Sequence, residues 1–377
     1  MMNFSDTVLK YTERAQYSLR QLYQSYGYQR YKVSKFEEYD LYASNKSFLI
    51  SENVLTFTDT NGKLMALKPD VTLSIVKNVG AGDPTTHKVY YNENVYRTAA
   101  GMDGFREIMQ TGLECIGNID LYTMAEVLML AQKSLALISE DHILDLSHLG
   151  LVAGLLESAG ISESACAEML GYIGNKNIPA IEALCKKLAI STETLEAISV
   201  ITELYEPLDT ALLRIEPLLK GEKMREAYDE LCAMRDLLRA GGCEEQIRLD
   251  FSIVNDMSYY NGIIFRGYVN GIPDGVLAGG RYDGMLARMG KRQGAIGFAV
   301  YLDLLERLGE SGAGFDTDTL LIYGGDVSAE TVASAAKALR ESGECVLVEP
   351  MGAEQTVRYR KLCRVTEEGV KILEAND

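Results

Sequence analysis

The pattern of apolar and polar residues changes its period several times along the chain. Residues 5–26 place apolar side chains at intervals of three or four, which is typical of a long amphipathic helix, and Gly27 is positioned to end it. Residues 53–70 alternate instead, and Asn61 and Gly62 separate two apolar runs. This combination predicts a β-hairpin that turns at the Asn-Gly pair.

The middle of the chain predicts a second pair of strands and then a helical region. Residues 87–98 and 105–117 have strand character and are joined by a glycine-containing segment, so we expect an antiparallel pair. From about 149 to 242 apolar residues recur at helical spacing, and Gly241 follows the last stripe. We interpret this region as an all-helical insertion.

Strands return after the insertion. Ile247, Leu249, Phe251 and Ile253 alternate with polar residues, and the apolar run "GIIFRGYV" follows. From about residue 315 the order is strand, helix, strand and short elements, which predicts a small α/β segment. The whole pattern predicts an α+β fold, in which an antiparallel sheet with flanking helices is interrupted by helices and then resumed.

The length of the chain, 377 residues, favours several structural units over one core. No apolar run approaches the roughly 18 to 20 residues that span a bilayer. The first residues are too polar for a signal peptide, so we expect a cytoplasmic protein. The predicted parts are a first core segment over 1–148, the helical insertion over 149–244, a second core segment over 245–312 and the small α/β segment over 313–377.

Composition narrows the choice of ligands and partners. The chain carries 37 Lys and Arg against 54 Asp and Glu, a net charge of −17, which opposes binding of tRNA or any other polyanion. Its seven cysteines are scattered without a CxxC pair, and it has three histidines. We therefore expect no disulfide framework, no metal site and no cofactor.

Three short segments carry polar residues suited to binding a ligand. Asp70 and Thr72 follow a predicted strand and share a face if the segment is extended. Gln110 and Glu114 lie four apart in a predicted strand, which also places them on one face. The segment 277–285, "LAGGRYDGM", is interpreted as a glycine-bracketed turn. Each segment alone also fits a structural turn or a solvated face.

The order of the segments resembles the class II core of histidyl-tRNA synthetase over roughly residues 1–310. The strings most specific to that family are "YYNGIIF" and "AGGRYDG". The resemblance implies an antiparallel sheet of six or seven strands with flanking helices. It also implies a homodimer formed through the first motif of the family, although Val33 and Ser34 stand where that motif usually has a proline.

The resemblance implies a histidine-binding pocket. Asp70 and Thr72 stand where the family holds the substrate α-amino group, and Gln110 and Glu114 match a second pair of amino-group ligands. An ammonium favours carboxylate and amide oxygens, whereas an imidazole favours aromatic walls and hydroxyl partners. Two acids facing an empty site predict a wet pocket that prefers a cationic amine. The remaining members of the predicted histidine-binding set are Arg106, Tyr259, Tyr260 and Tyr282.

The nucleotide half of the implied site lacks charged residues that the family uses for adenylation. Arg97 matches the arginine that holds the α-phosphate and is the residual nucleotide-site residue. The ring of Tyr301 replaces a glycine and is expected to occupy nucleotide space. Losing one preorganised donor typically costs about a hundred- to a thousandfold in rate, so we expect no adenylation and no catalytic residue. The other replaced positions, all four charged in the family, carry Ala99, Asn255, Ser258 and Leu304.

The chain keeps the residues of the amino-acid pocket and lacks those of the activation site. In this respect it resembles the ATP phosphoribosyltransferase regulatory subunit family, the synthetase-like paralogues of histidine biosynthesis. The string "NDMSYYNG" and the short C-terminal segment also fit that family. The resemblance implies a non-catalytic, allosteric subunit that joins a short-form catalytic subunit in a hetero-octamer. Assembly would activate the catalytic subunit, and histidine would inhibit it by feedback.

Two alternatives stay open at this point. An active histidyl-tRNA synthetase is opposed by Asn255, Leu304 and the negative charge, and histidine-dependent pyrophosphate exchange would reveal it. A synthetase-like enzyme or amino-acid-binding module acting on another partner is the second. Co-purification with a catalytic phosphoribosyltransferase would argue against it.

Overall fold

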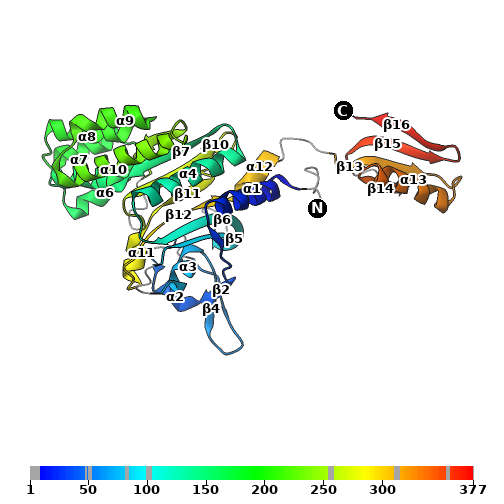
Figure 1. The fold of residues 1–377 in the computed structure, drawn as a ribbon, viewed down its shortest axis with the longest axis horizontal. Coiled ribbons are helices and arrows are strands. Elements are labelled where there is room, and N and C mark those ends of the chain that lie inside the picture. The colour runs from blue at the N-terminus through cyan, green and yellow to red at the C-terminus, as the bar shows by residue number, and fades with distance from the viewer. Residues whose placement is uncertain are drawn as a thin grey trace. The chain divides into compact units, whose positions relative to one another are not determined.

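The chain divides into two compact units, Met1–Gly309 and Glu310–Asp377, each with its own sheet (Figure 1). The larger unit contains a nine-stranded sheet and a three-stranded sheet, and the smaller unit contains a four-stranded sheet. The computed structural model describes residues 9–46, 49, 53–80, 85–98, 104–253, 259–309, 315–353 and 357–376.

The nine-stranded sheet confirms the predicted α+β fold. Neighbouring strands within this sheet are antiparallel, except that β1 runs parallel to β5 and β7 runs parallel to β9. The expected number of six or seven strands was too low, because one strand of two residues and one of three residues lie at the two edges and carry no readable period. In spatial order the strands are β1 (Gln29–Arg30), β5 (His87–Thr98), β6 (Phe105–Gly117), β12 (Gly294–Tyr301), β11 (Leu277–Arg281), β10 (Ile263–Val269), β7 (His142–His148), β9 (Ile247–Asp250) and β8 (Tyr205–Pro207).

Two helices cover one face of this sheet (Figure 1). Helix α1 (Tyr11–Ser25) lies within the predicted first helix, although residues 9 and 10 are described and precede it, and it packs over β5 and β6. Helix α4 (Leu121–Ile138) lies over β7, β10 and β12. The expectation that no apolar run approaches membrane-spanning length was wrong for α4, which alone among the described residues is long and apolar enough, but 67% of it is buried inside the protein. Its continuous apolar surface therefore belongs to the core.

The predicted hairpin is confirmed and forms part of the three-stranded sheet. Strands β3 (Thr56–Thr58) and β4 (Leu64–Leu67) pair antiparallel, and Gly62 between them has φ +81°, a conformation that glycine adopts without strain. β4 also pairs with β2 (Phe36–Glu38), which is followed by helix α2 (Tyr39–Ala43). The chain then enters helix α3 (Thr72–Asn78) beside the large sheet.

The insertion contains the expected helices, but it is not all-helical. The three residues of β8 pair with β9 at the edge of the large sheet. The sequence gives no strand signal there because the segment is short and ends at Pro207, which cannot donate to a ladder. The helices are α5 (Leu149–Ser158), α6 (Glu163–Gly174), α7 (Ile178–Lys187), α8 (Thr192–Glu203), α9 (Leu208–Ile215) and α10 (Gly221–Ala240), with a 3-10 turn at Glu216–Leu218.

The smaller unit begins with the predicted strand, helix and strand. Strand β13 runs parallel to β14 and β15, and β15 pairs antiparallel with β16. The residues beyond 350 were expected to form short elements, yet they form strands of eight and seven residues. The elements are β13 (Thr317–Tyr323), α13 (Ala329–Glu341), β14 (Val346–Pro350), β15 (Tyr359–Thr366) and β16 (Gly369–Ala375).

Candidate functional site

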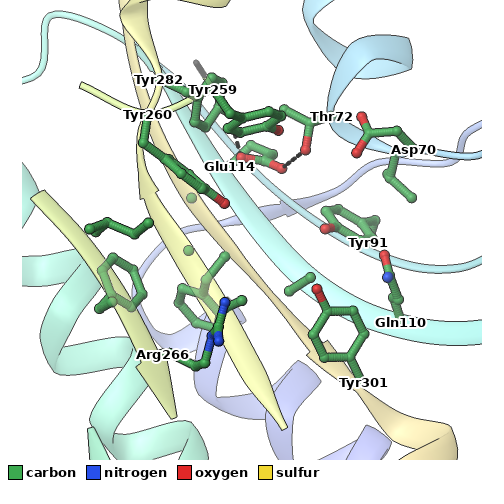
Figure 2. A pocket seen from close by; sticks show the side chains of 18 of the residues that line it. Asp70, Thr72, Tyr91, Gln110, Glu114, Tyr259, Tyr260, Arg266, Tyr282 and Tyr301 are labelled. Carbon is green, nitrogen blue, oxygen red and sulfur yellow. Dashed lines mark hydrogen bonds between the residues drawn. The ribbon is translucent and has the colours of Figure 1, made fainter. Parts of the chain in front are cut away.

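A pocket of about 310 Å³ lies on the face of the large sheet opposite α4. On β6, Leu113 and Cys115 belong to the core beneath α4, whereas the alternate residues Gln110 and Glu114 face the pocket (Figure 2). The predicted period-two arrangement of this pair is therefore confirmed. The predicted site residues that line the pocket are Asp70, Thr72, Arg97, Gln110, Glu114, Tyr259, Tyr260 and Tyr282.

Glu114 is the buried acid at the centre of the pocket, with 2% of its surface exposed. The Thr72 hydroxyl donates to one carboxyl oxygen at 2.7 Å, and the Tyr282 hydroxyl donates to the other. Gly297 on the adjacent strand makes room for it, since a Cβ there would lie 1.9 Å from Glu114 Oε2. Two hydroxyl donors from distant parts of the chain thus fix the carboxyl group.

Burial raises the pKa of Glu114 to about 8, although the hydrogen bonds from Tyr282 and Thr72 oppose the shift. Asp70 nearby adds a further upward contribution to this pKa. At neutral pH the group is therefore largely protonated, and it can donate a hydrogen bond as well as accept one.

Asp70 forms the second acidic position and is paired within the protein. Its carboxylate accepts a hydrogen bond from the Leu73 amide at 2.8 Å, and Arg97 Nη2 lies 3.9 Å from its other oxygen. Arg97 also donates through Nε to the Pro69 carbonyl at 2.7 Å. Burial raises the pKa of Asp70, and the Arg97 charge lowers it.

The expectation that Asp70 and Thr72 lie on one face of an extended segment was wrong. Thr72 begins helix α3, and the Asp70 side chain accepts a hydrogen bond from a backbone amide of its first turn. Aspartate favours this position because it satisfies an amide that has no partner within the helix. The two side chains still reach one pocket because the helix starts at its edge.

Three tyrosines form an aromatic wall beside Glu114 (Figure 2). The ring centroids of Tyr259 and Tyr260 lie 4.5 Å apart, and those of Tyr259 and Tyr282 lie 5.9 Å apart. The stretch before Tyr282 was expected to be a turn, but Leu277–Arg281 is strand β11. Its glycines serve packing, since a Cβ on Gly280 would lie 2.7 Å from the Tyr260 ring. The turn begins at Tyr282, which precedes helix α11 (Asp283–Arg288).

Of the remaining predicted positions, some line the pocket and others do not. Tyr301 points into the pocket and is the cross-strand neighbour of Gln110 (Figure 2). Leu304 lies in the 3-10 turn Leu302–Leu305 and packs against the main core. Arg106 is exposed on β6, four residues before Gln110, and is not part of the pocket lining, so its ligand role stays a prediction. Ala99, Asn255 and Ser258 lie outside the described residues.

Two polar residues that line the pocket were not predicted from the sequence. Tyr91 of β5 is buried, and its hydroxyl lies 2.6 Å from the position that a Cβ on Gly112 would occupy. Arg266 of β10 faces the pocket from the far side. Its only sequence signal is a single cation within the apolar run "GIIFRGYV".

The pocket's charges differ from the simple picture of two repelling acids. One acid is largely protonated, the other has an arginine nearby, and Arg266 adds a further cation. The expected preference for any cationic amine is therefore too broad, because both acids already have partners. Within the described ranges no group of three or more His, Cys, Asp or Glu is arranged to hold a metal ion.

Comparison with known sequences places the chain in a family. Residues 5–305 match the histidyl-tRNA synthetase family model. The chain is 27% identical over 347 residues to the ATP phosphoribosyltransferase regulatory subunit of Oceanobacillus iheyensis, covering 90% of this chain and 85% of that protein. It is 30% identical over 308 residues to the regulatory subunit of a Thermoanaerobacter species, covering 80% of each.

Solved structures share the fold. A regulatory subunit/histidyl-tRNA synthetase from Bacillus halodurans superposes with a TM-score of 0.74 at 24% identity, covering 97% of this chain and 96% of that one. A chain of the ATP phosphoribosyl transferase complex from Thermotoga maritima gives 0.60 at 20% identity, covering 77% and 97%. With the sequence matches, these findings show that the chain belongs to the ATP phosphoribosyltransferase regulatory subunits, a non-catalytic family with the histidyl-tRNA synthetase fold.

Proposed function

We propose that this regulatory subunit serves the first step of histidine biosynthesis as its histidine sensor. Histidine occupies the pocket around Glu114 and mediates feedback inhibition of a short-form ATP phosphoribosyltransferase catalytic subunit. The observation that carries the proposal is the buried Glu114 carboxyl group, held by Thr72 and Tyr282 and walled by tyrosines. This arrangement suits an imidazole better than an aliphatic or purely cationic side chain.

In this proposal Glu114 meets the imidazole ring instead of the amino group, which was the role implied by the resemblance, and the chemistry of the ring supports the change. A neutral imidazole has one donor and one acceptor nitrogen, and a carboxyl group with a pKa of about 8 can serve either one near pH 7. The rings of Tyr259, Tyr260 and Tyr282 supply flat apolar walls. Histidine therefore finds a reversible hydrogen-bond partner within an aromatic enclosure.

The other end of the pocket suits the amino group of histidine. Asp70, Thr72 and Gln110 carry carboxylate, hydroxyl and amide oxygens and lie to one side of Glu114 in the pocket (Figure 2). An ammonium is satisfied by acceptors of this kind. Arg97 accompanies Asp70 and keeps that carboxylate compensated while the pocket is empty.

The same pocket is poorly equipped for adenylation. Arg97 is shared between Asp70 and the Pro69 carbonyl, Tyr301 projects into the space beside Gln110, and Leu304 has no charge. Phosphoryl chemistry depends on positive charges directed at the phosphates. We infer that the chain recognises the amino acid and makes no product from it.

The proposed assembly is a hetero-octamer with the catalytic subunit, with the regulatory subunit forming a homodimer through its synthetase-like core in the cytoplasm. The solved complex from Thermotoga maritima, whose chain shares this fold, supports an assembly with a catalytic subunit. Assembly activates the catalytic subunit, and histidine shifts the complex toward a poorly active state through differential affinity. Such couplings are typically worth about 1 to 3 kcal/mol.

Calorimetric titration of the isolated chain with histidine tests the proposal. Saturable binding is expected, and the absence of binding at millimolar histidine would contradict it. A pyrophosphate exchange assay on the same sample separates this function from its enzymatic alternative. We expect no exchange with histidine and ATP.

A further inference from the structure

Arg266 is a cation inside the pocket whose charge has no partner in the described protein. It extends from β10, where its cross-strand neighbours are Asp145 of β7 and Ala278 of β11. No hydrogen bond or ion pair among the described residues involves its guanidinium, although Asp145 is next to it on the sheet. A partly buried guanidinium of this kind is expected to meet an anion.

A glycine makes room for the stem of the Arg266 side chain. A Cβ on Gly275 would lie 2.8 Å from both Cγ and Cδ of Arg266, so the aliphatic stem runs where that side chain would be. Gly275 does not have the positive φ that would by itself require glycine. The missing side chain at this position therefore serves to let the arginine reach the pocket.

A second donor faces the same space from β6. Gln110 is 3% exposed, and its side-chain nitrogen has no hydrogen-bond partner in the described structure. A buried donor without a partner costs about 1 to 3 kcal/mol, which a ligand acceptor would recover. Small residues, Ala299 on β12 and Ala278 on β11, lie on the two strands between Gln110 and Arg266. The floor between the two donors is thus made of small residues, and the Tyr301 ring stands at its Gln110 end.

We propose that Arg266, together with the Gln110 amide, holds the carboxylate of the bound amino acid. This inference rests on the proposed binding of histidine in the pocket. A zwitterion then spans the site, with its ammonium directed toward Asp70 and its carboxylate directed toward Gln110 and Arg266. Figure 2 shows the Tyr301 side chain between Gln110 and Arg266, so the carboxylate lies over this ring. The guanidinium is suited to this task because its planar fork matches a carboxylate in a bidentate contact.

The assignment gives the pocket a specificity that the acids alone do not provide. An analogue with an alcohol in place of the carboxylate, such as histidinol, keeps the imidazole and the ammonium. It carries a net positive charge and offers Arg266 only a neutral hydroxyl group, so the charge-assisted bidentate contact is lost and the two cations repel each other. The subunit is therefore expected to report on the free amino acid and to ignore related amines and alcohols.

Calorimetric titrations with histidine and histidinol test the inference on the full-length chain. The wild type is expected to bind histidine at least about tenfold more tightly than histidinol, as expected for a charge-assisted hydrogen bond. In Arg266→Gln, histidine affinity falls by about tenfold to a hundredfold, while histidinol affinity stays the same or rises. Arg225→Gln, which removes an exposed arginine of the helical insertion, is the matched control and changes neither.

A second variant protects the test against misfolding of the first. Gly275→Ala keeps the arginine but places a methyl group in the path of its stem, so the preference for histidine over histidinol should fall there too. Thermal unfolding of each variant without ligand confirms that it is folded.

The outcomes separate the inference from the proposed function. If the wild type binds histidine and Arg266→Gln keeps the wild-type ratio of histidine affinity to histidinol affinity, the carboxylate assignment is wrong. The proposed function as a histidine sensor is then unaffected. If the wild type binds neither ligand at millimolar concentration, the sensor itself fails and the inference fails with it. Binding of inorganic phosphate that needs Arg266 and leaves histidine affinity unchanged would reassign the arginine to a phosphate.

Discussion

The two halves of the pocket share strands β6 and β12 but have opposite properties. In the amino-acid half, Glu114 is held by the hydroxyls of Thr72 and Tyr282. In the nucleotide half, Tyr301 occupies space and Arg97 is engaged with Asp70 and the Pro69 carbonyl. Recognition needs shape and a few satisfied polar groups, whereas adenylation needs several charges directed at phosphates. A few substitutions can therefore remove the chemistry and leave the recognition.

The largest expected effect comes from removing the acid of the amino-acid half. Glu114→Ala should weaken histidine binding at least about a hundredfold, because the imidazole ring loses its polar partner and the hydroxyls of Thr72 and Tyr282 lose their acceptor. In a complex with the catalytic subunit this variant should still activate but should not respond to histidine. Glu107→Ala, an exposed acid on the same strand, is the control and should keep the response. Full feedback in Glu114→Ala would place the sensor elsewhere.

The second effect concerns pH and stability. The native pKa of Glu114, about 8, lies above its ordinary value of 4.5, so the folded state binds more protons between these values. Its contribution to stability is therefore complete below pH 4.5 and is lost as the pH rises to about 8. Relative to Glu114→Gln, the wild type should lose on the order of a few kcal/mol over this window.

Urea unfolding of the wild type and Glu114→Gln at a series of pH values between 5 and 9 measures this difference. Other buried acids, such as Asp70, titrate in both proteins and should largely cancel. A difference that does not change with pH would show that Glu114 is not the shifted group.

Gly297→Ala is expected to have the next largest effect. Its Cβ would lie 1.9 Å from Glu114 Oε2, so the carboxyl group must move away from Thr72 and Tyr282. Overpacking of this kind typically costs about 1 to 3 kcal/mol, and histidine binding should weaken with it. Gly284→Ala in α11, where a Cβ would meet nothing within 4 Å, is the control and should be neutral or slightly stabilising. Equal unfolding midpoints for the two variants would argue against the close contact.

The smallest effect is expected in the nucleotide half. Tyr301→Ala opens space beside Gln110 but restores no charge, so pyrophosphate exchange should remain at background. Histidine affinity should change by less than about fivefold, since one peripheral contact is typically worth about 1 kcal/mol or less. Exchange activity in this variant would mean that the volume of the Tyr301 ring alone prevents adenylation.

The sequence predicted much of the sheet and most of the pocket, for reasons visible in particular residues. Gln110 and Glu114 follow the period of a strand, and the Asn61-Gly62 turn has a local cause. The contacts to Glu114 are different in kind, because Thr72 and Tyr282 lie 42 and 168 residues away along the chain. Only the resemblance to a known family brought these three together before the structure did.

The features that the sequence did not reveal depend on pairing between distant strands and on competition between strand and helix at a single position. Short strands such as β8 form because a neighbouring strand offers its edge, which no local period records. Asp70 could be assigned to a strand or to a helix start, and the free amides of α3 decide in favour of the helix. Arg266 was overlooked because one charged residue in an apolar strand is a common pattern, and its meaning depends on Gly275 and on the empty pocket beside it.

A crystal structure of the chain with saturating histidine tests the central claim most directly. We predict that the imidazole lies against Glu114 between Tyr259 and Tyr282, that the amino group lies beside Asp70, and that Tyr301 stays beside Gln110. Histidine bound outside this pocket, for example at a subunit interface, would contradict it. So would an empty pocket in crystals grown at a concentration that inhibits the assembled complex.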